Sequence, residues 1–217
     1  MRKPGSVLVF SDDWGRHPSS CQHLVGEMLG EFPVVWVNTI GMRTPKLDWV
    51  TMRRAAEKLA GWVGRKPDSA GSGVLAAERA PLAQPADSPM VVSPRMWPWF
   101  TRALDRRFNR HLLASQLRAL IAALPPPVVA ITTIPITADL PGVLDVAKWV
   151  YYCVDDFSQW PGLDGAAMAQ MDDSMIAAAN ELVAVSEQLR SHIHARGRDS
   201  SLLTHGVHLS HWLNADT

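Results

Sequence analysis

The chain has 217 residues, 47% of them hydrophobic, and its 21 basic residues balance its 21 acidic residues. This length and apolar content suffice for the core of one domain, and the balanced charge excludes the overall attraction to nucleic acid that a strongly basic protein has. No apolar run approaches the roughly 20 residues of a membrane-spanning helix, and the run at 7–10 is too short for the core of a signal peptide.

Short apolar runs alternate with helix-like stretches along the chain. The sequence predicts strands at 7–10, 34–38, 74–77, 128–132, 148–154, 182–185 and 201–204. It predicts helices at 20–29, 47–63, 99–124, 166–179 and 187–196, and an irregular surface excursion around one strand at 65–98. This alternation is typical of an α/β fold, and we predict a Rossmann-like, doubly wound, mostly parallel sheet with helices on both faces.

Two loops that follow predicted strands are unusually polar. The loop after 7–10 contains Asp13, Trp14, Gly15 and His17, and the loop after 148–154 begins with Asp155 and Asp156. Ligands of open parallel sheets bind beyond the carboxyl ends of the strands, where such loops lie. A single aspartate there more often caps a helix or solvates a turn, but two such loops at one edge favour a binding site.

An ordered series of motifs resembles the N-terminal domain of family 4-like GT-B glycosyltransferases, the group that includes enzymes of teichuronic acid and exopolysaccharide synthesis. The motifs are VLVFSDDW at 7–14, VVWVN at 34–38, YYCVDD at 151–156, WPG at 160–162, ELVAVSEQL at 181–189 and THGVH at 204–208. The resemblance covers most of the chain outside roughly 65–98 and depends on the order and spacing of the motifs. Two departures are the hinge sequence His-Gly-Val-His in place of Asn-Gly-Val-Asp, and the Asp-Trp-Gly-Arg loop in place of a glycine pair.

The resemblance implies that residues 1–217 form the acceptor-side domain of a GT-B glycosyltransferase, ending near the interdomain hinge and without the donor-binding domain. It implies a hexosyltransferase-type reaction in cell-envelope polysaccharide synthesis, from a nucleotide-sugar donor to a saccharide or lipid-linked acceptor, with no cofactor. Because GT-B catalysis takes place between two domains, the isolated chain is expected to show no sugar transfer. No Asp-x-Asp motif occurs, and His205, His208 and His211 are spaced so that they do not converge in a loop, so we predict no metal site.

Sugar transfer benefits from a carboxylate or imidazole that accepts the proton of the acceptor hydroxyl. Asp156 and Asp155 are the predicted catalytic residues, and we favour Asp156, because adjacent residues leaving a strand point in opposite directions and only one should face the acceptor. The predicted substrate-binding residues are Asp13, Trp14, Gly15, His17, Ser186 and Gly206. Ser186 either caps the helix at 187–196 or faces the cleft.

The stretch at 47–65 has an apolar face with tryptophans and an opposite basic face. It either packs on the sheet or lies on an anionic membrane surface, which Trp97, Trp99 and Phe100 near Arg95 and Arg102 would extend. Two cysteines in predicted elements indicate buried thiols, so we expect a cytoplasmic protein. If the stretch at 47–65 lies on a membrane surface, we expect the protein to be peripheral on the inner membrane face. Two non-enzymatic alternatives are a membrane-docked acceptor subunit and a Rossmann-like module that binds an unrelated ligand.

Overall fold

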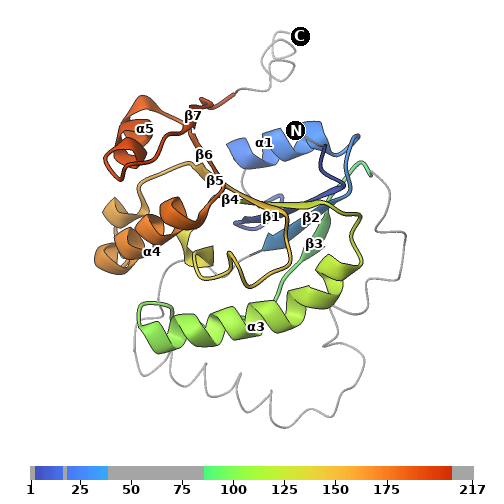
Figure 1. Cartoon of the computed structure of the whole chain (residues 1–217), viewed down its shortest axis with the longest axis horizontal. Coiled ribbons are helices and arrows are strands. Elements are labelled where there is room, and N and C mark those ends of the chain that lie inside the picture. The colour runs from blue at the N-terminus through green and yellow to red at the C-terminus, as the bar shows by residue number, and fades with distance from the viewer. Residues whose placement is uncertain (1–2, 17–18, 39–85, 207–217) are drawn as a thin grey trace.

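The computed structural model describes residues 3–16, 19–38 and 86–206, and within them seven parallel strands form one sheet (Figure 1). The strands are β1 (Ser6–Ser11), β2 (Val34–Asn38), β3 (Met90–Val92), β4 (Val128–Thr132), β5 (Lys148–Cys153), β6 (Glu181–Ala184) and β7 (Ser201–Leu202). Their order is β3-β2-β1-β4-β5-β6-β7. The chain therefore winds outward in one direction from β1 and in the other from β4, and the switch point lies between these two strands.

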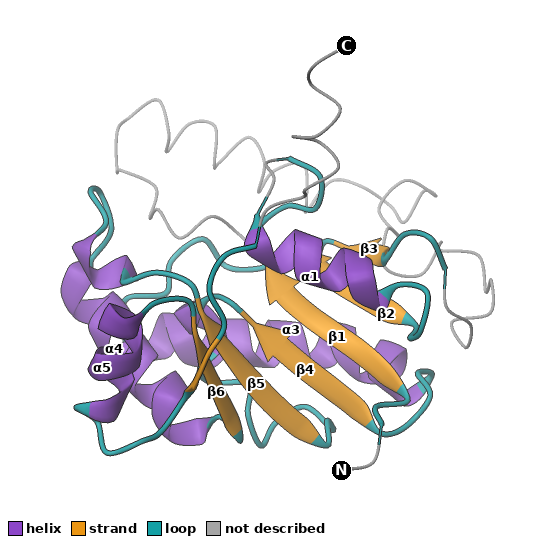
Figure 2. Ribbon diagram, turned by 90° about the horizontal axis from the view of Figure 1, so that it is seen from above, coloured by secondary structure: helices purple, strands orange, loops and turns teal. Residues whose placement is uncertain are grey.

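Helices cover both faces of this sheet. The helices are α1 (Ser20–Met28), α3 (Ala103–Ala122), α4 (Gly165–Ala178) and α5 (Glu187–His194), and short 3-10 turns, η1 (Pro135–Thr137) and η2 (Phe157–Gln159), follow β4 and β5. Helices α1 and α3 lie on opposite faces (Figure 2). The predicted α/β fold, a Rossmann-like doubly wound sheet with helices on both faces, is thus confirmed. None of the helices in the described ranges combines the length and apolarity needed to cross a membrane.

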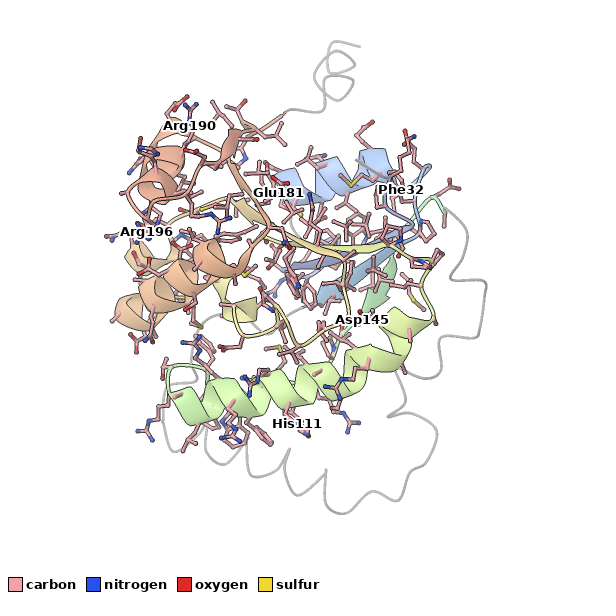
Figure 3. The ribbon with its side chains drawn as sticks, viewed as in Figure 1. Phe32, His111, Asp145, Glu181, Arg190 and Arg196 are labelled. Carbon is pink, nitrogen blue, oxygen red and sulfur yellow. The ribbon has the colours of Figure 1, made fainter. Side chains whose placement is uncertain are left out.

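The central strands are buried on both sides, as their continuous apolar runs require. All six residues of β1 are buried, and Phe10, Trp36 and Tyr151 are fully enclosed. Parallel sheets covered on both faces favour such runs over an alternating pattern. On α3, Leu113, Leu117 and Ile121 recur every four residues and face the sheet, while His111 projects from the outer side (Figure 3).

A partly buried hydrogen-bond network connects α4 and α5 to β5, the strand that leads into the second polar loop. The hydroxyl of Tyr151 donates to Asp172 Oδ1 at 2.6 Å, and His192 Nε2 lies 2.7 Å from Asp172 Oδ2. Burial raises the pKa of Tyr151 well above its usual value, so the phenol stays protonated and remains a donor. The strand end is therefore held in place by two helices.

Some sequence predictions differ from the structure, and others lie outside its described residues. Strand β3 (Met90–Val92) falls within the stretch predicted to be irregular, and α3 begins at Ala103 instead of residue 99. Phe100 is 3% exposed and belongs to the core, so it cannot extend a membrane surface as the second alternative for 47–65 proposes. The predicted strand at 74–77 and the predicted helix at 47–63 lie outside the described residues.

Candidate functional site

A pocket of about 460 Å³ lies at the carboxyl ends of β1, β4 and β5, across the switch point of the sheet. Open parallel sheets bind their ligands at this position. The pocket is lined by Ser11, Asp12, Ser19, Ser20, Cys21, Thr133, Ile134, Val154, Asp155, Phe157, Trp160 and His205. These residues come from five separate segments, so the fold and not one local motif creates the site.

The β1 and β4 sides of the pocket carry linked polar groups. The hydroxyls of Ser11 and Thr133 lie 2.8 Å apart, and the Ser11 hydroxyl donates to Asp12 Oδ1 at 3.0 Å. The backbone N–H of Thr133 donates to the carbonyl oxygen of Phe10 at 3.1 Å, which fixes the Thr133 hydroxyl beside β1. The pocket therefore presents a carboxylate and two hydroxyls whose positions are set by the sheet.

The first turn of α1 forms a second side of the pocket. The Ser19 hydroxyl accepts the N–H of Gln22 at 3.3 Å and caps the helix. The next residue, Ser20, is hydrogen-bonded through its hydroxyl to Nδ1 of His205, which follows β7. The first turn of α1, which follows the central strand β1, and the segment after β7, at one edge of the described sheet, are thereby joined at the pocket.

The two aspartates after β5 have different environments. Asp156 Oδ1 accepts the N–H of Ser158 at 3.1 Å and its hydroxyl at 2.5 Å, which caps η2. Asp155 is exposed and lines the pocket, and its Oδ1 accepts the N–H of Asp156 at 2.8 Å. Of the two predicted catalytic residues, Asp155 lines this pocket, whereas the favoured Asp156 caps η2 and does not line it.

An exposed aromatic ring completes the pocket on the β5 side. Phe157 is buried, whereas Trp160 is 42% exposed, and the two ring centroids lie 5.2 Å apart. Phe157 thus packs against the indole of Trp160, and part of the indole stays accessible to solvent. A flat apolar surface beside carboxylates and hydroxyls suits a ligand that has both an apolar face and many hydroxyl groups.

Three predicted binding residues of the β1 loop, Asp13, Trp14 and Gly15, do not line the pocket. Asp13 forms an ion pair with Arg16 at 3.1 Å, and the ring of Trp14 packs on Trp36 with a centroid distance of 4.8 Å. Gly15 has a φ of +75°, a conformation that favours glycine, so its role in the turn is conformational. His17 lies outside the described residues.

The remaining two predicted residues also lie away from the main pocket. The Ser186 hydroxyl accepts the N–H of Leu189 at 3.2 Å and caps α5. The sequence leaves two roles open for Ser186, capping the helix or facing the cleft, and the structure shows the first. Gly206 lines a smaller neighbouring pocket of about 190 Å³, which shares Ser20 with the main pocket.

Several residues that line the pocket are absent from the sequence prediction. Asp12 directly precedes the predicted Asp13, and Trp160 belongs to the WPG motif, so both carried a signal in the sequence. Thr133 follows the predicted strand at 128–132 and could have been found by inspecting every loop at the carboxyl edge. His205 lies in the hinge motif at 204–208, and its approach to α1 depends on the completed sheet.

Both cysteines are buried free thiols. Burial, together with the nearby Asp12 carboxylate, raises the pKa of the Cys21 thiol to about 12. Burial and Asp172 raise the pKa of Cys153 to about 12 as well. Because the thiolate is the reactive form, neither cysteine is suited to act as a nucleophile at neutral pH. Among the described residues, no group of three or more His, Cys, Asp or Glu side chains is placed to hold a metal ion.

No protein-family model matches the chain, and no curated protein is significantly similar to it in sequence. The function must therefore be inferred from the fold and from the chemistry of the pocket.

Proposed function

We propose that the chain is the acceptor-side domain of a glycosyltransferase and that the pocket at the ends of β1, β4 and β5 binds the acceptor, a saccharide or a lipid-linked saccharide. The observation that carries the proposal is the combination of the Asp155 carboxylate and the exposed Trp160 indole in one pocket at the switch point. The sequence resemblance to GT-B enzymes supports the same function. A nucleotide-sugar would be the donor, and the buried thiols fit the cytoplasm as the location.

In the proposed reaction, Asp155 acts as the general base. It accepts the proton of the acceptor hydroxyl while the hydroxyl oxygen forms a bond to the anomeric carbon of the donor sugar. The bond from that carbon to the phosphate oxygen breaks, and its electron pair leaves with the nucleoside diphosphate. Asp12, Ser11 and Thr133 would bind hydroxyls of the acceptor, and Trp160 would pack on its apolar face.

The charge of the pocket favours a neutral saccharide over a nucleotide. Its described lining contains two carboxylates, Asp12 and Asp155, and no lysine or arginine. Dinucleotide-binding sheets of this topology hold a pyrophosphate on a glycine-rich turn after the first strand. Here that turn begins with Ser11 and Asp12, and a carboxylate at this place repels phosphate. This observation argues against a nucleotide as the ligand of this pocket, and it leaves open the alternative of a Rossmann-like module that binds another ligand.

Replacement of Trp160 by alanine is expected to weaken saccharide binding about tenfold, since an aromatic contact of about 1 kcal/mol and its buried area are lost. Titration of the protein with a panel of neutral oligosaccharides, followed by NMR or calorimetry, measures the effect. Trp99→Ala is the matched control, because Trp99 does not line the pocket. Equal affinities of Trp160→Ala and the unaltered protein would contradict the proposed binding mode.

A further inference from the structure

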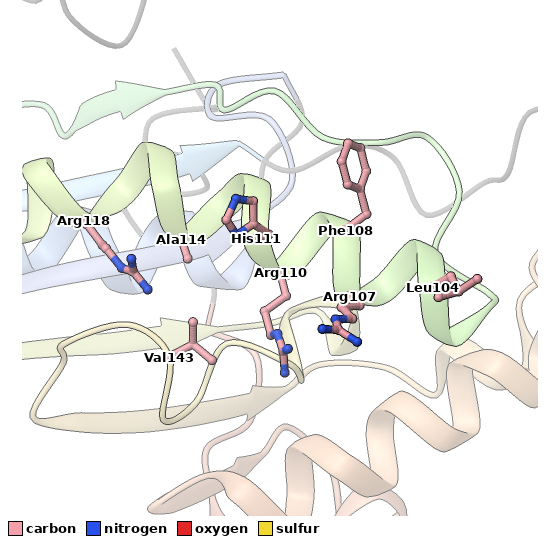
Figure 4. Close-up of a pocket in the computed structure, with 8 residues that line it drawn as sticks. All are labelled: Leu104, Arg107, Phe108, Arg110, His111, Ala114, Arg118 and Val143. Carbon is pink, nitrogen blue, oxygen red and sulfur yellow. The ribbon is translucent and has the colours of Figure 1, made fainter.

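The outer face of α3 carries large apolar side chains next to arginines. Leu104 is 80% exposed and Phe108 is 49% exposed, although both are residues that folding usually buries. They line a groove of about 630 Å³ together with Arg107, Arg110, His111, Ala114, Arg118 and Val143 (Figure 4). Because the residues at 104, 107, 108, 111 and 118 recur at helical spacing, they form one continuous stripe along the helix.

The positive charge of this groove is not neutralised within the described part of the chain. The only acidic residue of α3 is Asp105, which accepts a hydrogen bond from the indole N–H of Trp97 at 3.0 Å. Arg106 points inward and binds Asp139 through two hydrogen bonds of 2.8 Å. No ion pair to another described residue is formed by Arg107, Arg110 or Arg118. The partner of this face should therefore be anionic.

Aromatic side chains extend the apolar part of the stripe. The rings of Trp97 and Phe108 meet edge to face with centroids 5.8 Å apart, and Trp99 lies 4.8 Å from Trp97. Trp97 and Trp99 are half-buried, so one part of each ring remains accessible. Exposed leucine, phenylalanine and tryptophan beside arginine is the composition of helices that lie at a membrane interface. A nucleic acid would complement the arginines but would leave an aliphatic side chain such as Leu104 in water.

We propose that this face of α3 docks on an anionic phospholipid surface. Leu104 and Phe108 enter the boundary between headgroups and acyl chains, and the arginines at 107, 110 and 118 bind the headgroups. This docking face is distinct from the stretch at 47–65, and it stands independently of the proposed sugar transfer.

The docking face also has a defined relation to the pocket. Helix α3 follows β3, so its first turns lie at the carboxyl edge of the sheet, the same edge that carries Asp155. Contact through Leu104 and Phe108 therefore brings this edge toward the bilayer. If the acceptor is a lipid-linked saccharide, this orientation shortens the distance between the bilayer surface and the pocket that the saccharide must enter.

Co-sedimentation with vesicles of phosphatidylcholine, with and without phosphatidylglycerol, tests the docking. We expect binding only to the anionic vesicles, and weaker binding as salt rises. Each Arg→Gln substitution at 107, 110 and 118 should lower the partition coefficient about fivefold, and the triple variant on the order of 100-fold. Phe108→Ser should also reduce binding, at unchanged charge. Arg190→Gln is the matched control on α5, far from α3 (Figure 3), and should bind like the unaltered protein.

Three results would overturn the proposal. The first is the absence of binding to anionic vesicles, or equal binding to neutral and anionic vesicles. The second is a triple variant that binds like the unaltered protein while retaining its thermal stability. The third is a protein that does not sediment with vesicles and instead binds a soluble polyanion such as heparin. A protein that does not sediment with vesicles but forms a dimer, which the Phe108→Ser variant loses, would count equally against it.

Discussion

Under the proposed function, replacing Asp155 by asparagine is expected to lower the turnover of sugar transfer, assayed with this chain together with a donor-binding domain, about 10²–10⁴-fold, because the amide cannot accept the proton of the acceptor hydroxyl. Asparagine keeps the shape of the side chain and the oxygen that accepts the N–H of Asp156, so the loop should retain its conformation. Rates per folded molecule, measured with a saturating donor, give the effect of the lost base.

The neighbouring aspartate supplies the matched control. Asp156→Asn retains an oxygen that can accept the N–H and hydroxyl of Ser158, and Asp156 does not line the pocket. We therefore expect turnover of this variant to stay within a few-fold of the unaltered enzyme, with at most about 1 kcal/mol of lost stability from a weakened cap. If Asp155→Asn slows turnover less than tenfold, or if Asp156→Asn alone is inactive, Asp155 is not the base.

A methyl group added at Gly165 is expected to destabilise the protein by about 1–3 kcal/mol and to disturb the pocket. A Cβ at this first residue of α4 would lie 2.5 Å from the backbone carbonyl oxygen of Ser158, within η2. Backbone cannot rotate away as a flexible side chain can, so η2 or α4 must shift. Because η2 lies between Asp155 and Trp160, Gly165→Ala should also weaken saccharide binding. Urea unfolding and oligosaccharide titration measure the two effects.

Gly26→Ala is the matched control for that substitution. Gly26 lies within α1, and a Cβ built there meets no atom within 4 Å. Alanine should therefore stabilise the helix by about 0.5–1 kcal/mol, because it loses less backbone entropy on folding than glycine. Equal stabilisation by Gly165→Ala and Gly26→Ala would show that α4 and η2 are not as close as described.

The sequence predicts most of the sheet because its central strands are unbroken apolar runs. The ranges predicted for β2 and β4 coincide with the observed strands, and those for β1 and β5 differ by one residue at the ends. Strand β3 was missed because it has three residues, lies between Pro89 and Pro94, and pairs only with β2 among the described strands. A short edge strand has too little apolar pattern to be recognised without its neighbour.

The candidate site was predicted by position more reliably than by residue. The rule for parallel sheets identified the loops after β1 and β5, and both contribute to the pocket. Which of two adjacent aspartates faces a crevice depends on the local turn. At 155–156 the carboxylate of Asp156 caps η2, and in the β1 loop the carboxylate of Asp13 forms an ion pair with Arg16. The contact between His205 and Ser20 joins residues 185 positions apart, so only the folded sheet could bring them together.

Mapping of backbone amide chemical shifts is the most direct test of the proposed acceptor pocket. The protein is titrated with a panel of neutral gluco-, galacto- and manno-oligosaccharides and, separately, with UDP. We expect at least one saccharide to shift the amides of Ser11, Thr133, Asp155 and Trp160, which line the pocket, and UDP to leave them unchanged. Shifts of these amides by UDP, with none by any saccharide, would contradict the assignment of the pocket to a sugar acceptor.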